Sequence, residues 1–152
     1  MGFFNNLLDN FKSKDFHISP NMNVATAQKQ FKANFRLSLR VYKGNQFADG
    51  DQTFAALNKR TSAKIKSSSD DISIKSSMTV KEFENVIKDH YGLKVQVADE
   101  FNRYLINDKY TLGQASRRQH LIDHLKSKGY DSIEDFLEKH NCKTLEEYYS
   151  KN

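Results

Sequence analysis

One stretch of 21 residues occurs twice in this chain, and this repeat limits the possible folds more than any other feature. Residues 78–98 read MTVKEFENVIKDHYGLKVQVA, and residues 22–42, 56 positions earlier, read MNVATAQKQFKANFRLSLRVY without a gap. The two copies agree in their apolar positions, which are Val24/Val80, Ala27/Phe83, Phe31/Ile87, Phe35/Tyr91, Leu37/Leu93, Leu39/Val95 and Val41/Val97. Agreement over so many positions indicates an internal duplication.

Each copy is predicted to form a helix followed by a strand. Apolar residues three and four apart indicate one buried helix face, and the alternation that follows is typical of a strand with one buried face. In the first copy, either Asn23 or Thr26 is the expected N-cap. In the second copy, Thr79 and Glu82 have the spacing of a capping box, and Gly92 stands where the helix should end.

A turn and a returning strand are expected after each of these strands. In the first copy, Gly44-Asn45 supplies the turn and Gln46–Ala48 the return; in the second copy, Tyr104–Ile106 returns. A short helical turn capped by Thr53 or Thr111 then closes each copy. These two threonines are 58 positions apart, so the second copy carries two extra residues in its turn.

The segment between the copies alternates in the manner of a β-hairpin. Ala63–Lys66 and Ile72–Lys75 are the predicted arms, and the polar residues Ser67–Asp71 form the turn. An alternative arrangement joins both copies in one shared sheet, with residues 63–75 as its edge or as a linker. The sequence leaves these two arrangements open.

With this hairpin, the second copy resembles the ubiquitin-like β-grasp. The residues that carry the resemblance are Ala63–Lys75 for the hairpin, Thr79–Leu93 for the helix and its exit, and Tyr104–Leu112 for the last strand and its turn. In the first copy, Leu39–Phe54 is similar to the ubiquitin-like strand, turn and strand, although no hairpin precedes its helix. The resemblance implies a grasp-like α+β unit. It argues against a covalent modifier, because nothing here resembles a conjugating Gly-Gly tail.

The N-terminal residues form a separate lead-in. An apolar stripe at helical spacing, with few charges beside it, predicts a short amphipathic helix; its members are Phe3, Phe4, Leu7, Leu8 and Phe11. Docking of this helix on the domain is favoured over a membrane surface, because interfacial helices carry a strongly basic polar face. A short extended piece is expected at Asp15–Pro20.

The C-terminal residues contain a smaller repeat of twelve residues. Ser132–Leu137 (SIEDFL) recurs as Thr144–Tyr149 (TLEEYY) and more faintly as His120–Leu125 (HLIDHL). In the two clear copies, the first residue is an N-cap and the fourth completes a capping box, while Gly129 and Asn141 stand at C′ positions. This pattern predicts three short helices, which need a surface to cover because helices of this length are marginal alone.

The predicted fold is therefore α+β: two duplicated helix–strand–strand units followed by a run of short helices. The expected segments are 1–20 (amphipathic helix and lead-in), 21–60 (first repeat), 61–116 (hairpin and second repeat) and 117–152 (short helices). At 152 residues, the chain is long enough to bury a core. No stretch has the length and apolar character of a membrane span or the form of a signal peptide, and a single cysteine excludes an internal disulfide, so a cytoplasmic location is expected.

Residues with known catalytic or metal-binding patterns are few. His120, Asp123 and His124 lack a third metal ligand in a known spacing, and Asp49 with Asp51 lacks the later carboxylates of a calcium loop. Cys142 has no adjacent activating base and is interpreted as a structural thiol. We therefore predict no catalytic residue, no metal site and no cofactor.

Two functions follow from these observations. The first is a non-enzymatic, bacterial-type interaction or adaptor module that binds another protein through grooves between the copies. The second is a basic protein that binds single-stranded DNA or RNA, since the net charge is +5 and residues 1–77 carry 12 Lys and Arg against 6 Asp and Glu. Aromatic and basic side chains near the turns are the predicted binding surface, namely Arg40, Tyr42, Lys43, Phe47, Arg103 and Tyr104. No feature of the sequence specifies an oligomeric state.

Overall fold

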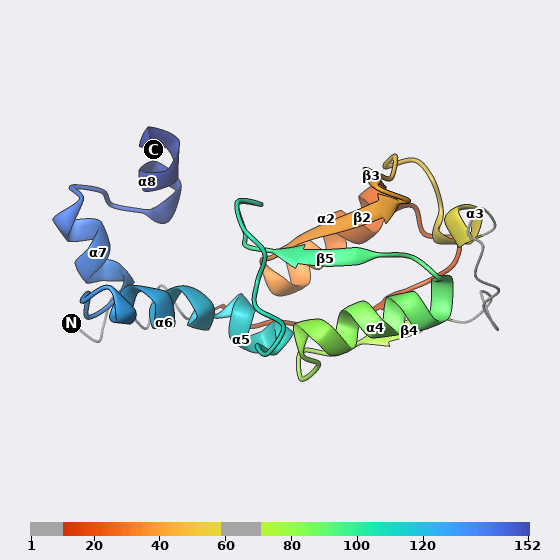
Figure 1. Ribbon diagram of the computed structural model, residues 1–152, viewed down its shortest axis with the longest axis horizontal. Helices are drawn as coiled ribbons and strands as arrows, with labels where there is room; N and C mark the ends of the chain where they lie inside the picture. Colours follow the sequence, from red (N-terminus) through yellow and green to blue (C-terminus); the bar gives the residue numbers. More distant parts are fainter. Residues whose placement is uncertain (1–10, 59–70) are drawn as a thin grey trace.

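The computed structural model describes residues 11–58 and 71–152 and has an α+β architecture (Figure 1). Within the described residues, the strands are β1 (Phe16–Ile18), β2 (Ser38–Lys43), β3 (Gln46–Phe47), β4 (Ile72–Ile74) and β5 (Val95–Ala98). The helices are α2 (Val24–Phe35), α3 (Phe54–Asn58), α4 (Val80–Tyr91), α5 (Leu112–Ser116), α6 (Gln119–Ser127), α7 (Ile133–Lys139) and α8 (Leu145–Lys151). The predicted N-terminal helix, apart from Phe11, and the first arm of the predicted hairpin lie outside the described residues.

The two long helices, α2 and α4, begin at side-chain caps. Asn23 is the cap of α2, because its Oδ1 accepts a hydrogen bond from the N–H of Thr26 at 2.8 Å. At α4, Thr79 and Glu82 form the predicted capping box, and each of the two hydrogen bonds is 3.0 Å long. The helix ends at Gly92, whose φ of 68° lies in the left-handed region that glycine adopts without strain.

Two strand pairings, β1 with β4 and β2 with β5, join the first half of the described chain to the second. β2 lies at the centre of a three-stranded sheet of order β3-β2-β5, and β1 pairs with β4 in a second sheet; all pairs are antiparallel. Of the two arrangements that the sequence left open, the structure has the shared sheet. Both ladders have a symmetric register. If 56 is added to the number of one residue of a pair and subtracted from the number of the other, the result is another pair of the same ladder. The pairs are Leu39↔Val97 with Val41↔Val95, and Phe16↔Ile74 with Ile18↔Ile72.

Equivalent main-chain contacts tie the start of each long helix to the short helix that follows it. Asn23 forms a β-bridge with Thr53, and Thr79 forms one with Thr111. The hydrogen bonds around these bridges also correspond, donor by donor. They are Val24 N–H to Gln52 O (2.9 Å) and Val80 N–H to Tyr110 O (2.8 Å), then Phe54 N–H to Met22 O (3.2 Å) and Leu112 N–H to Met78 O (2.8 Å).

One expectation for the strands is corrected. The returning strand predicted over Tyr104–Ile106 is reduced to one bridge between Leu105 and Ala98. The Asp99 side chain accepts the N–H of Arg103 at 2.6 Å and so holds residues 99–103 in a turn. After this turn only Leu105 pairs with β5. β4 is the second arm of the predicted hairpin and pairs with β1; the first arm lies outside the described residues, so the hairpin itself stays a prediction.

Both repeated segments contribute to one hydrophobic core. The rings of Phe31 on α2 and Phe83 on α4 lie 5.2 Å apart, and both residues are fully buried. Phe16 on β1 packs against Phe31 at 6.2 Å. In Figure 1, β5 lies between β2 and α4, so the sheet and the helices of the two segments are interleaved. The predicted segments 21–60 and 61–116 therefore do not pack as separate bodies.

The C-terminal helices form a second, smaller core. They lead away from the sheets in the order α5, α6, α7 and α8 (Figure 1). The buried residues Leu112 and Ala115 of α5 belong to the main core. The apolar faces of α6, α7 and α8 meet in one cluster, against which Phe101 of the loop after β5 also packs. The buried members of this cluster are Leu121, Leu125, Ile133, Leu137, Cys142 and Leu145. The three predicted short helices are thus present as α6, α7 and α8, and each covers its neighbour.

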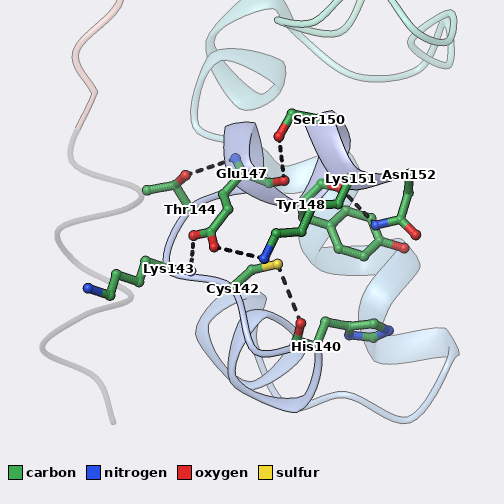
Figure 2. Close-up of polar contacts among 9 residues, drawn as sticks. All are labelled: His140, Cys142, Lys143, Thr144, Glu147, Tyr148, Ser150, Lys151 and Asn152. Carbon is green, nitrogen blue, oxygen red and sulfur yellow. Dashed lines mark hydrogen bonds and ion pairs between the residues drawn. The ribbon is translucent and has the colours of Figure 1, made fainter.

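The caps of α7 and α8 differ in one detail from the prediction. At α8, Thr144 accepts the N–H of Glu147 at 3.0 Å, as expected (Figure 2). The Glu147 carboxylate, however, accepts the N–H of Lys143 at 2.9 Å and not that of the cap residue. Asp135 of α7 likewise bonds to the residue before the cap. The reason is the backbone of the cap, since φ is −138° at Thr144 but −71° in the full capping box at Thr79.

Candidate functional site

One pocket lies between the loop after β5 and the C-terminal helices. Its volume is about 520 Å³, within the range of ligand-binding pockets. We call it the loop–helix pocket. Its walls come from the loop (Tyr104–Asn107, Lys109 and Tyr110), from α6 (His120, Leu121, Asp123 and His124) and from α8 (Tyr149). Three segments that are distant in the sequence therefore build one concave surface, and most of that surface is apolar.

Aromatic rings and one carboxylate give this pocket a defined shape. The His120 ring lies between Tyr104 and Tyr110, with centroid distances of 5.9 Å and 6.2 Å. The Tyr110 hydroxyl donates to Asp123 Oδ2 at 2.7 Å, while Gln119 Nε2 donates to Asp123 Oδ1 at 2.8 Å. Both oxygens of this carboxylate are therefore engaged, and the loop is linked to α6 through side chains.

The titration of these groups follows from burial and hydrogen bonding. Burial lowers the pKa of His120 to about 4, so its imidazole is neutral near pH 7, and its Nδ1 atom has no hydrogen-bond partner in the described part of the chain. The bond to Asp123 raises the pKa of Tyr110 to about 12. The same bond lowers the pKa of Asp123. The pocket thus presents a neutral histidine between two neutral tyrosines.

Leu105 lies at the rim of this pocket. Its side chain is exposed, and within the described part of the chain its main-chain N–H and C=O are not paired with a neighbouring strand. The side chain is 46% exposed. The main-chain groups of the two residues beside Leu105 face β5. The N–H of Ile106 donates to Val97 O at 2.9 Å, and Tyr104 O accepts the N–H of Asp99 at 3.0 Å. In an antiparallel pair of this kind, the N–H and C=O of the middle residue point away from the partner strand. Within residues 11–58 and 71–152, neither group of Leu105 forms a hydrogen bond.

A second candidate surface is the outer face of the three-stranded sheet. It is defined by Arg40 and Tyr42 of β2, Phe47 of β3, and Lys94 and Gln96 at β5, and we call it the sheet face. Phe47 is 65% exposed, and its ring centroid lies 5.1 Å from that of Tyr42. The Tyr42 hydroxyl lies 2.6 Å from Gln96 Oε1, and Lys94 Nζ lies 4.9 Å from the Tyr42 ring.

The six residues predicted as a binding surface fall into two groups. Arg40, Tyr42 and Phe47 lie together on the sheet face, and Lys43 is exposed at the end of β2 beside them. Arg103 and Tyr104 form the second group, because their side chains turn toward the C-terminal helices: the Arg103 guanidinium lies 4.6 Å from the Tyr149 ring, and Tyr104 lines the pocket. Two hydrogen bonds connect the two regions, from the Arg40 guanidinium to Asn102 Oδ1 at 2.7 Å and to the carbonyl oxygen of Asn102 at 3.2 Å.

Several residues of these surfaces were not predicted from the sequence. Lys94 and Gln96 occupy the polar positions of an alternating strand. This alternation identifies the outer face of β5 once the structure shows that the described residues leave that face accessible. Leu105 and Tyr149 carried no signal of their own, because each is an apolar residue in a segment where apolar residues were expected to be buried.

The other chemical candidates have ordinary surroundings. Within the described residues, no group of three or more His, Cys, Asp or Glu side chains is placed to hold a metal ion. Asp49 and Asp51 are exposed in the turn before α3. Cys142 is buried between α7 and α8, where its Sγ lies 3.4 Å from the carbonyl oxygen of His140 (Figure 2). No helix in the described ranges combines the length and the apolar character that a membrane crossing requires.

A groove between α4 and β5 holds one carboxyl group with an unusual titration. Glu84 lines this groove together with Lys94 and Gln96. Burial, followed by the nearby charge of Asp108, raises the pKa of Glu84 to about 7. This groove adjoins the sheet face but lies on the helix side of β5.

Comparison with known proteins adds no relative, since no family model, no curated protein and no solved structure matches this chain.

Proposed function

We propose that this chain is a non-enzymatic protein-binding module, and that its loop–helix pocket accepts an apolar side chain of an extended partner segment. The observation that carries the proposal is Leu105, which offers an exposed side chain and an unpaired main-chain N–H and C=O at the rim of an apolar pocket. An open strand edge of this kind is a template for pairing with another chain.

The main chain and the pocket support the same mode of binding. A partner in extended conformation would form hydrogen bonds with both open groups of Leu105 and so add one strand beside the bridge to Ala98. Alternate side chains of that partner would then point toward the pocket, whose aromatic walls are held by the bond between Tyr110 and Asp123. Main-chain pairing supplies affinity in this mode, and the pocket supplies specificity.

We also infer that residues 16–58 and 72–116 are two copies of one unit, joined about an approximate twofold axis. The support is the symmetric register of both ladders and the matching contacts at the helix starts. In this relation Phe47 corresponds to Leu105, because Phe47 pairs with Tyr42 as Leu105 does with Ala98. The resemblance of the unit to ubiquitin-like β-grasp proteins stays a prediction, and the proposed function does not depend on it.

The test is a selection of binding peptides from a random linear library displayed on phage, with the full chain as bait. We expect the enriched peptides to share an apolar residue in an extended context. Their binding should be lost in Leu105→Lys, which places a charge at the rim of the pocket. NMR titration of the wild-type chain with one such peptide should shift the amide signals of Tyr104, Leu105 and Tyr149.

The matched control is Phe47→Lys, the same substitution at the corresponding position on the opposite edge of the sheet. Both residues are exposed, so neither change should alter the fold, which circular dichroism can verify. Peptides that bind Leu105→Lys as tightly as the wild type, or a selection that enriches no common pattern, would refute the proposed site.

A further inference from the structure

We propose that the sheet face binds single-stranded nucleic acid, with bases stacked on Phe47 and Tyr42 and phosphates held by Lys94 and Arg40. This surface is separate from the loop–helix pocket, so the inference goes beyond the proposed protein binding. It assigns a second ligand class to a part of the molecule that the first function does not use.

The two rings form a stacking platform that is already arranged before a ligand arrives. Tyr42 and Phe47 are directly paired on β2 and β3, their centroids lie 5.1 Å apart and their planes differ by 33°. The contact of the Tyr42 hydroxyl with Gln96 Oε1 fixes the tyrosine ring against β5. Phe47 remains 65% exposed, so one ring surface is open to a planar apolar group. Nucleic-acid bases present such a surface regardless of their sequence.

The charges around the platform favour an anionic group such as phosphate over a neutral or basic one. Lys94 Nζ lies 4.9 Å from the Tyr42 ring, and Arg40 donates its hydrogen bonds to the uncharged Asn102. Within the described residues, neither cation belongs to an ion pair; the pairs formed there are Arg118–Glu100, Lys139–Asp135 and Lys151–Glu147. The five residues of the sheet face include no carboxylate.

Glu84 is an acidic group beside Lys94, whose charge acts on its carboxyl group, and its position is compatible with this inference. It shares the groove between α4 and β5 with Lys94, on the helix side of the strand. The aromatic rings are displaced from this groove toward β3. Phosphates that follow the line from Lys94 to Arg40 would therefore cross the outer side of the sheet.

The test is fluorescence anisotropy of the full chain with labelled oligo(dT) and oligo(U) of about 20 nucleotides, a length that exceeds the site size of one small domain. We expect binding at about 50 mM salt that weakens as salt is added. Two phosphate contacts predict a slope of about −1.4 in a plot of log K against log salt concentration. Phe47→Ala should weaken binding about 5- to 100-fold, the range found for loss of one stacked base.

Three control variants separate stacking from general charge attraction. Phe47→Trp should retain the affinity, because it keeps a planar ring. Lys94→Gln should flatten the salt dependence, whereas Lys109→Gln, which removes a charge from the rim of the pocket, should leave it unchanged. Leu105→Ala should bind nucleic acid as the wild type does.

Either of two results would overturn the inference: no binding at about 50 mM salt, where counterion release favours it, or binding that Phe47→Ala leaves unchanged. Neither result bears on the peptide site, which Leu105→Lys tests independently. Failure of one proposal is therefore distinguishable from failure of the other.

Discussion

His120 is the residue whose environment most strongly predicts a measurable pH effect. Burial lowers its pKa to about 4, whereas an unfolded histidine has a pKa of about 6.5. The unfolded state therefore binds a proton first. The stabilising contribution of neutral His120 is complete above about pH 6.5 and is lost as the pH falls from there toward 4. We expect a loss on the order of 3 kcal/mol in the free energy of unfolding, measured by urea denaturation at several pH values.

The effect is best measured as a difference between variants, because Glu84 acts in the opposite direction. Its raised pKa makes the folded state less stable as the pH rises toward 7. His120→Gln should remove the histidine contribution and leave that of Glu84. His124→Gln, an exposed position one helical turn away, should behave as the wild type. The same pH dependence in His120→Gln and in the wild type would contradict the assignment.

At the scale of single elements, the C-terminal helices depend on the chemistry of their ends. α6 and α7 both close with paired hydrogen bonds at a residue of positive φ, Gly129 in one and Asn141 in the other. Tyr130 N–H donates to Leu125 O at 3.0 Å, and Cys142 N–H donates to Leu137 O at 2.9 Å. These are Schellman motifs, and they set the angle at which the next short helix begins.

The N-cap of α8 gives a test at this scale. Thr144→Ala removes the acceptor for the N–H of Glu147 and should lower the free energy of unfolding by about 1 kcal/mol. Hydrogen exchange should quicken in α8 but not in α4. A peptide selected for the loop–helix pocket should also bind more weakly, because Tyr149 of α8 forms one wall.

Thr144→Ser is the matched variant, since serine caps a helix equally well. It should retain both the stability and the exchange rates of the wild type. If Thr144→Ala also left the exchange of α8 unchanged, the cap would contribute nothing to the order of this helix.

At the scale of the whole molecule, the two repeated segments hold each other through both sheets and one core. β1 pairs with β4, β2 pairs with β5, and Phe31 contacts Phe83 between α2 and α4. We therefore expect fragments 1–62 and 63–152, co-expressed as separate chains, to associate without a covalent link. Affinity purification through a tag on one fragment, followed by size-exclusion chromatography, would detect the complex.

Val41→Asp is the control for this experiment. Val41 is fully buried and lies opposite Val95, so a carboxylate there should prevent the association of the fragments. Two fragments that each fold alone and do not bind one another would contradict a shared core.

The sequence by itself determined the parts of this protein that depend on near neighbours. The helices at Val24–Phe35 and Val80–Tyr91, the capping box at Thr79 and the C′ residues Gly129 and Asn141 all followed from spacing. Apolar periodicity and helix caps involve residues only three or four positions apart, so they can be recognised in the sequence without knowledge of the fold.

Only the tertiary structure decided which strands meet and where the open surfaces lie. The alternation in Ile72–Ile74 suits any partner with a matching face, and only the fold showed that β1 pairs with it. The same holds for binding: Phe47 and Tyr104 looked alike near their turns, yet one lies on the sheet face and the other in the loop–helix pocket. Strand pairs and pockets are formed by residues far apart in the sequence, so no local sequence pattern predicts them.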